Sequence, residues 1–102
     1  MTNIIIGTTP TITYTFKIVS PADFSTAILT IKCNGQLILE KNLADASMGE
    51  NTLSWTLTQE ETLALGTRSC KMMLNWVTHS GKRGASEETA IMGVSNHVRE
   101  VI

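Results

Sequence analysis

The hydrophobic residues of this chain recur mostly at every second position, which is the period of a β-strand with one buried face. In the clearest run, residues 11–18, four apolar side chains alternate with three threonines and a lysine. This alternation predicts a strand with one apolar and one polar face. The buried face would consist of Ile12, Tyr14, Phe16 and Ile18.

A hairpin is predicted at Asn34-Gly35, because this dipeptide supplies the positive φ angles that a two-residue turn needs. The flanking runs, Ala27 to Cys33 and Gln36 to Asn42, would pair antiparallel. The return strand is apolar on both faces, which leaves its register open. In the register we expect, the inward residues are Leu29, Ile31 and Ile38, and the outward ones are Leu37 and Leu39.

The period changes after Leu53 to Thr58, which alternates like a strand and then runs into residues that start helices. Thr58 and Glu61 match a capping box, in which each side chain accepts a hydrogen bond from the other residue's backbone N–H. Gly66 would end this single turn. Such a turn can carry the chain between two sheets about 10 Å apart. We therefore expect Leu63 and Leu65 to enter the open end of a sandwich.

Three further segments read as strands: Asn3 to Ile6, Ser69 to Thr78 and Glu87 to Val94. Between the strands, residues 42–51 are predicted as a polar loop and residues 79–82 as a turn. Seven strands at a spacing of about ten residues, with turn chemistry between them, indicate an all-β sandwich. A chain of 102 residues is one domain by size, spanning residues 1–102.

The predicted fold is a seven-stranded, immunoglobulin-like, antiparallel β-sandwich. The helical turn lies between the fifth and sixth strands, where the immunoglobulin fold also crosses between its sheets. The cysteine pair and the central tryptophan of that fold are not at their expected positions. The prediction of strand order therefore rests on the strand count and the crossover.

The composition excludes several classes of protein. The chain is 42% hydrophobic and 17% charged, with a net charge of -1, which excludes a disordered chain and gives no general attraction to nucleic acid or anionic membranes. No apolar run reaches the roughly 18 residues that span a bilayer, and the amino terminus lacks the features of a secretory signal. We expect synthesis in the cytosol and no nucleic-acid or membrane partner.

Two cysteines, Cys33 and Cys70, end different predicted strands. Without an export signal, we interpret them as reduced, partly buried thiols that serve packing. The alternative is a disulfide that joins the two sheets. Neither cysteine has His or Cys neighbours at the spacing of metal ligands.

No combination of residues indicates catalysis. His79 and His97 have no neighbouring nucleophile or carboxylate, and the adjacent pair Glu60 and Glu61 points in two directions rather than forming a dyad. We predict no catalytic residue, no cofactor and no metal. His79, Lys82 and Arg83 form a small basic tip, which we interpret as a solvated hairpin end, with an anion contact as the alternative.

Both ends of the chain carry apolar residues beyond what one strand needs. Ile4, Ile5 and Ile6 put apolar side chains on both faces of a short strand, whereas an ordinary edge strand carries some charge. At the other end, Val94, Val98, Val101 and Ile102 share one face of a predicted short helix. Each segment would cover its own sandwich or a partner. The residues that we expect in an assembly interface are Ile4, Ile5, Ile6, Val98, Val101 and Ile102.

At these residues the chain resembles a group of small bacteriophage and prophage proteins. The likeness rests on the Gly-Thr-Thr-Pro turn with Thr-rich alternation at residues 7–17, the motif Leu-Thr-Gln-Glu-Glu-Thr at residues 57–62, and the apolar tail. The pattern is also similar to the amino-terminal sandwich domain of phage baseplate upper proteins. The resemblance implies a β-sandwich at the tail, baseplate or capsid surface of a phage particle, with no catalytic residues to carry over.

We therefore expect a non-enzymatic virion component, made in the cytoplasm of the host bacterium, that assembles through sheet edges and apolar termini. Its partners would be other phage structural proteins and copies of itself. The alternatives are an adhesin-like module that binds the host through loops, and a small phage inhibitor of a host protein.

Overall fold

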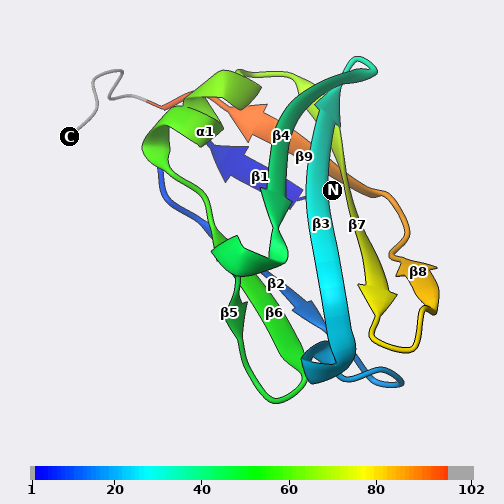
Figure 1. Cartoon of the computed structure of the whole chain (residues 1–102). Helices are drawn as coiled ribbons and strands as arrows, with labels where there is room; N and C mark the ends of the chain where they lie inside the picture. The colour runs from blue at the N-terminus through cyan, green and yellow to red at the C-terminus, as the bar shows by residue number, and fades with distance from the viewer. Residues whose placement is uncertain (1, 97–102) are drawn as a thin grey trace.

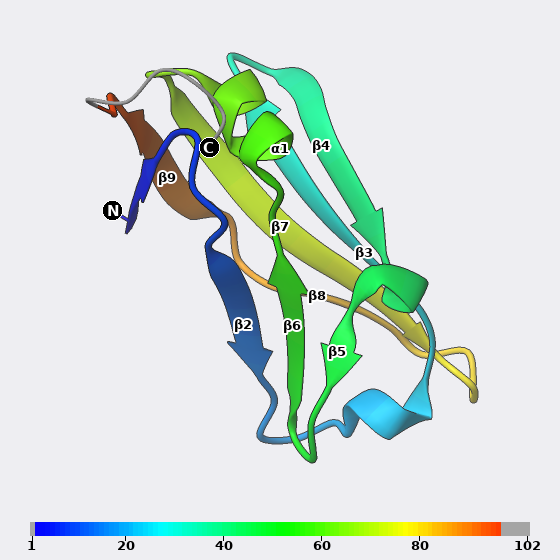
Figure 2. The ribbon, with the colours of Figure 1, turned by 90° about the vertical axis from the view of Figure 1, so that its left-hand side faces the viewer.

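Nine β-strands and one α-helix form residues 2–96, the part of the chain that this computed structural model describes. The strands lie in two layers (Figures 1 and 2). One layer is a six-stranded sheet with the order β1-β9-β7-β3-β4, in which β8 also pairs with β7. The other layer is a three-stranded sheet with the order β2-β6-β5. This arrangement confirms the predicted sandwich. The elements are β1 (Thr2–Ile5), β2 (Thr11–Thr15), β3 (Phe24–Cys33), β4 (Gln36–Asn42), β5 (Ser47–Met48), β6 (Thr52–Thr56), α1 (Gln59–Leu65), β7 (Ser69–Thr78), β8 (Arg83–Ala85) and β9 (Thr89–Val94), with 3-10 turns η1 (Pro21–Asp23) and η2 (Leu43–Asp45).

The predicted count of seven strands is wrong for the described residues, because β5 lies in the predicted loop at residues 42–51 and β8 lies in a segment for which no strand was predicted. β5 has two residues and β8 has three, which is too short for an alternating pattern to be visible in the sequence. β5 pairs with β6, and β8 pairs with the end of β7. Each short strand forms because its backbone can hydrogen-bond to the unpaired edge of a longer strand. Which edge is available depends on the tertiary structure.

The predicted strand over residues 11–18 ends earlier than expected, at Thr15. The Phe16 N–H still donates to the carbonyl of Asn51, at 2.8 Å, and its ring is buried, but the chain then leaves the sheet. Ile18 is consequently 97% exposed, so its predicted place in the core is wrong. The alternation continues in the sequence beyond the point where a neighbouring strand is present to pair with it.

The hairpin at Asn34-Gly35 forms as predicted, with φ angles of 53° and 78°. Its return strand β4 contains a β-bulge, since Ile31 pairs with Leu39 and Lys32 pairs with Leu37, which leaves Ile38 without a partner. The predicted outward direction of Leu39 is wrong. The bulge lets Ile38 and Leu39 both pack against the core, and this explains why β4 is apolar at successive positions.

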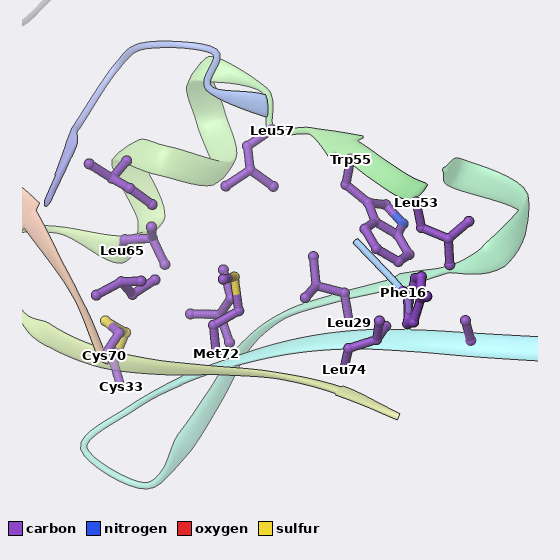
Figure 3. Packing of buried hydrophobic residues seen from close by; sticks show 14 of the residues in the cluster. Phe16, Leu29, Cys33, Leu53, Trp55, Leu57, Leu65, Cys70, Met72 and Leu74 are labelled. Carbon is purple, nitrogen blue, oxygen red and sulfur yellow. A yellow bond between two sulfur atoms is a disulfide. The ribbon is translucent and has the colours of Figure 1, made fainter. Parts of the chain in front are cut away.

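The core lies between the two sheets and is built from the predicted alternate positions (Figure 3). Trp55 is fully buried, and its indole N–H donates to the carbonyl of Asn42 at 3.0 Å, so that the buried polar atom is satisfied. Rings of Phe16, Phe24 and Trp76 pack at centroid distances of 5.2 to 5.6 Å near one end. The buried apolar residues are Ile4, Phe16, Phe24, Ala27, Leu29, Ile31, Cys33, Leu53, Trp55, Leu57, Leu65, Cys70, Met72, Leu74 and Ile91.

Helix α1 carries the chain from β6 in the small sheet to β7 in the large one, as predicted. The capping box is complete, because Glu61 N donates to the Thr58 hydroxyl at 3.1 Å and Thr58 N donates to the Glu61 carboxylate at 2.8 Å. Gly66 ends the helix at φ 62°. Leu65 is buried as expected, whereas Leu63 is only half-buried and Thr62 takes the second buried position.

The Glu61 carboxylate also makes an ion pair with Lys41 of β4, at 2.9 Å, which joins α1 to the large sheet. Partial burial raises the pKa of Glu61, but hydrogen bonds from Lys41 and Thr58 and the Lys41 charge outweigh it, so the net pKa is lowered. A lowered pKa in the folded state stabilises the fold above the ordinary value of about 4.3. This contribution is lost as the pH falls through the folded-state pKa.

We expect Glu61→Gln to cost up to about 1 kcal/mol of unfolding free energy at pH 7, because the amide keeps an acceptor for the cap but loses the charge. The difference from wild type should shrink when urea unfolding is repeated below about pH 4. The control is Glu60→Gln, which changes an exposed neighbour in the same turn and should have a smaller effect. A pH-independent cost of Glu61→Gln would contradict the ion pair as the cause.

Cys33 and Cys70 form a disulfide, and the interpretation of these residues as reduced thiols is therefore wrong. The alternative bridge between sheets is also wrong, because the two cysteines are direct partners on β3 and β7 of the same sheet. Their Cα atoms are 4.2 Å apart, as in closely spaced antiparallel pairs. Sequence alone does not show that β3 and β7 are neighbours, so this pairing could not be deduced.

Candidate assembly surface

The predicted interface residues lie at the two ends of the chain, and the structure describes one of these ends. Val98, Val101 and Ile102, the predicted helix that contains them and His97 lie outside the described residues. Val94, which was grouped with that helix, is the last residue of strand β9. The candidate surface is therefore built from β1 and its neighbours.

Strand β1 belongs to the large sheet and β2 to the small one, so the chain changes sheets between them within its own domain. β1 pairs in parallel with β9, and the predicted wholly antiparallel sandwich is wrong at this pair. Ile4 lies opposite Gly93 and is only 5% exposed, because it packs in the domain's own core. Ile5 is 49% exposed and Ile6 is half-buried.

Beyond Ile6 the chain is held by helix α1. Gly7 has φ 79°, and its N–H donates to the hydroxyl of Thr62 at 2.9 Å. The Thr62 hydroxyl proton is shared between the carbonyls of Thr8, at 2.9 Å, and Gln59, at 3.1 Å. The Gln59 amide donates in turn to the Gly7 carbonyl at 3.3 Å. The turn at residues 7–10 and the motif at residues 57–62 therefore contact each other directly.

We expect Thr62→Val to destabilise the domain by about 1–3 kcal/mol, because the isosteric side chain leaves the Gly7 N–H and the Thr8 carbonyl without their partner. Urea unfolding of the intact domain measures this cost. The matched control is Thr11→Val, which removes an exposed hydroxyl that pairs with Thr56 and should change stability by less than about 0.5 kcal/mol. Equal effects of the two substitutions would show that the Thr62 hydroxyl does not stabilise the fold by bonding the Gly7 N–H and the Thr8 carbonyl.

The outer face of the sheet next to β1 carries a small apolar patch. Ile91 and Gly93 of β9 are buried, so Met92 and Val94 face outward, where Val94 is the direct partner of Ile5. Met92 and Val94 are both half-buried. We call Ile5, Met92 and Val94, with the outer edge of β1, the β1 edge patch. The sequence could have identified Met92 and Val94, because they fall on the face of the predicted strand opposite Ile91 and Gly93.

The edge of β1 differs from the edges formed by β4 and β5, and it shares its lack of charge with the edge strand β2 of the small sheet. β1 contains no charged residue and no bulge, and within residues 2–96 no strand pairs with its outer side. The opposite edge, β4, carries Glu40, Lys41 and a bulge, and β5 is only two residues long. Charges, bulges and shortness are the usual means of preventing sheet edges from pairing. At β1 the Ile5 carbonyl instead accepts a hydrogen bond from the Thr8 hydroxyl, at 2.6 Å.

Groups that could carry chemistry are dispersed in the described part of the chain. His79 is exposed, and its backbone N–H donates to the carbonyl of Asp23 at 2.8 Å. Within residues 2–96, no group of three or more His, Cys, Asp and Glu side chains is placed to hold a metal ion. Burial raises the pKa of Tyr14, and the nearby Ser86 hydroxyl lowers it in part; among residues 2–96 the Tyr14 hydroxyl has no hydrogen-bond partner of good geometry. The prediction that the chain has no catalytic residue stays a prediction.

No family model matches this chain, and no curated protein is significantly similar to it. In residues 2–96, no helix has both the length and the apolar character to cross a bilayer.

Proposed function

We propose that this chain is a non-enzymatic structural component of a bacteriophage particle, at the tail, baseplate or capsid surface. It is incorporated by docking other phage structural proteins, or copies of itself, at the β1 edge patch. The observation that carries the proposal is the uncharged, unpaired edge of β1 beside the exposed side chain of Ile5. Such an edge offers backbone hydrogen bonds to a partner strand, while neighbouring apolar side chains add buried area.

The proposal includes an immunoglobulin-like fold. The sheet orders β9-β7-β3-β4 and β2-β6-β5 correspond to the orders G-F-C-C′ and B-E-D of that fold, and α1 lies at the crossover between strands E and F. The core differs, because the disulfide joins the strands equivalent to C and F, and Trp55 lies on the strand equivalent to E. The proposed likeness is therefore one of strand order, and the disulfide and the buried tryptophan lie on different strands than in the immunoglobulin fold.

Self-association tests the docking site. We expect the wild-type chain to form oligomers in light-scattering measurements as its concentration rises, and Ile5→Lys to raise the dissociation constant at least about tenfold. The control is Leu37→Lys, which adds the same charge at a 46% exposed leucine on the opposite edge strand β4 and should associate like wild type. A wild-type chain that stays monomeric, or equal effects of both substitutions, would contradict self-association through β1.

The setting in a particle is tested separately. Mass spectrometry of phage particles from a bacterium that carries the gene should find the chain in several copies per particle. Its absence from particles, when the chain is present in the producing cells, would refute the proposal. The same experiment separates a virion component from an inhibitor that acts only inside the cell.

A further inference from the structure

Three connections gather at the end of the sandwich that lies opposite α1 (Figures 1 and 2). They are residues 16–23 between β2 and β3, residues 49–51 between β5 and β6, and residues 79–82 between β7 and β8. We call this surface the loop end. The β1 edge patch lies toward the other end of the large sheet, where α1 also lies (Figure 1).

The most exposed large apolar side chain of residues 2–96 is Ile18, at the loop end. Its exposed fraction is 97%, against 46–51% for Ile5, Leu37 and Met48. An isoleucine so placed contributes almost no buried area to its own fold, yet it adjoins an open hollow of about 420 Å³. The hollow is lined by Ile18, Val19, Asp23, Thr78, His79, Ser80 and Lys82.

Hydrogen bonds hold the walls of this hollow in place. His79 N donates to the carbonyl of Asp23 at 2.8 Å, which joins the connection before β3 to the hairpin after β7. The Thr78 hydroxyl accepts from Lys82 N at 3.1 Å and lies 2.9 Å from the Ser80 hydroxyl, so the hairpin is braced from within. A surface that is ordered before binding loses less conformational entropy when a partner docks.

The charged side chains at and next to the loop end carry a small excess of positive charge. Lys82 lines the hollow, Lys17 precedes Ile18 in the chain, and Arg83 begins the adjoining strand β8. All three are exposed, and in the described part of the chain none of them forms a salt bridge. The carboxylates of this end are Asp23, which lines the hollow, and Glu50 on the neighbouring connection. The three cations exceed these two carboxylates by one, whereas the chain as a whole has a net charge of -1.

We infer that the loop end is a docking site for an acidic protein segment that inserts an apolar side chain beside Ile18. Insertion removes the isoleucine from water, and acidic residues flanking the inserted side chain meet Lys17, Lys82 and Arg83. A nucleic acid or a free phosphate matches the charge but leaves Ile18 in water, and for this reason we assign a protein segment. The inference rests on the loop end alone and is independent of the β1 edge patch.

The test uses a random-peptide display library panned against the full-length chain. We expect the enriched peptides to contain an apolar residue flanked by Asp or Glu. Their affinity should fall at least about tenfold with Ile18→Ser and also with Lys82→Glu, and binding should weaken as salt is raised. Matched controls are Leu37→Ser and Lys32→Glu, which make the same changes at exposed positions of β4 and β3 and should bind like wild type.

Because Ile18 and Lys82 are exposed, the variants should keep the unfolding midpoint of wild type, which urea unfolding verifies. Peptides that bind wild type and Ile18→Ser equally would overturn the inference. So would enrichment of sequences without acidic residues, or a failure to enrich any sequence. Binding of single-stranded DNA with the same dependence on Lys82 but none on Ile18 would identify the site as a simple anion site and would likewise refute it.

Discussion

Replacing Gly93 by alanine is expected to cost at least about 4 kcal/mol of unfolding free energy, enough to unfold most small domains. A Cβ atom at this position would overlap the carbonyl oxygen of Gly66, which is backbone and cannot rotate away. Urea unfolding followed by circular dichroism measures the loss. The expected result is a chain that is largely unfolded without denaturant.

The neighbourhood of Gly93 explains why the strand cannot move to make room. Its N–H donates to the carbonyl of Arg68 at 3.1 Å, and on its other side it pairs with Ile4 of β1. Gly66 itself has φ 62° and ψ −163°, a conformation that is essentially restricted to glycine. The two glycines lie where the end of α1 passes over β9, next to the pairing of β9 with β1.

Gly35→Ala is the control for this substitution. Gly35 has φ 78°, but a Cβ atom there would meet no other atom within 4 Å, so only the backbone conformation is penalised. The expected cost is about 1–2 kcal/mol. If Gly93→Ala cost no more than Gly35→Ala, the close approach of the two glycine backbones would be refuted.

The second large effect is expected from the disulfide. Cys33 and Cys70 are separated by 37 positions. In the chain-entropy model, closing a loop of this size raises the free energy of the unfolded chain by about 4 kcal/mol, because it removes conformational entropy. The double variant Cys33→Ala with Cys70→Ala should lose about this amount. The measurement is the midpoint of urea unfolding in the presence and absence of a thiol reductant.

The reductant supplies the internal control for the disulfide. Wild type should become less stable when it is reduced, whereas the double variant should not respond. Since both cysteines are nearly inaccessible to solvent, reduction should require partial unfolding and should be accelerated by urea. A wild-type midpoint that is the same with and without reductant would show that the bond does not stabilise the fold.

Of the two candidate surfaces, the sequence drew attention to one segment and predicted a core position in the other. The Ile4-Ile5-Ile6 run correctly identified an unusual strand, but only pairing with β9 decides that Ile4 is buried and Ile5 is exposed. Ile18 continues the alternation of β2, which predicts a place in the core, yet it is almost fully exposed. A hydrophobic pattern shows which side chains could be buried together, and it does not show where the neighbouring strand ends.

Features that depend on a few adjacent residues were predictable. The turn at Asn34-Gly35 follows from the conformations these two residues tolerate, and the capping box from Thr58 to Glu61 closes within one helical turn. The long strands β4 and β7 have the predicted bounds, β7 because its side chains alternate over ten residues and β4 because it begins at the Asn34-Gly35 turn. In each case the interacting groups are close in the chain, so the sequence contains the whole interaction.

Features that join distant segments became visible only in the folded molecule. The parallel pairing of β1 with β9, the bond between Cys33 and Cys70, the contact of Gly66 with Gly93 and the exposure of Ile18 all depend on which strands lie side by side. That choice is made by the packing of the whole core, since many partner strands could satisfy the same local pattern. Interactions between residues close in the chain thus determined where the turns, the helix and the long strands form. Long-range packing determined which strands pair, which cysteines form the disulfide and which apolar side chains are exposed.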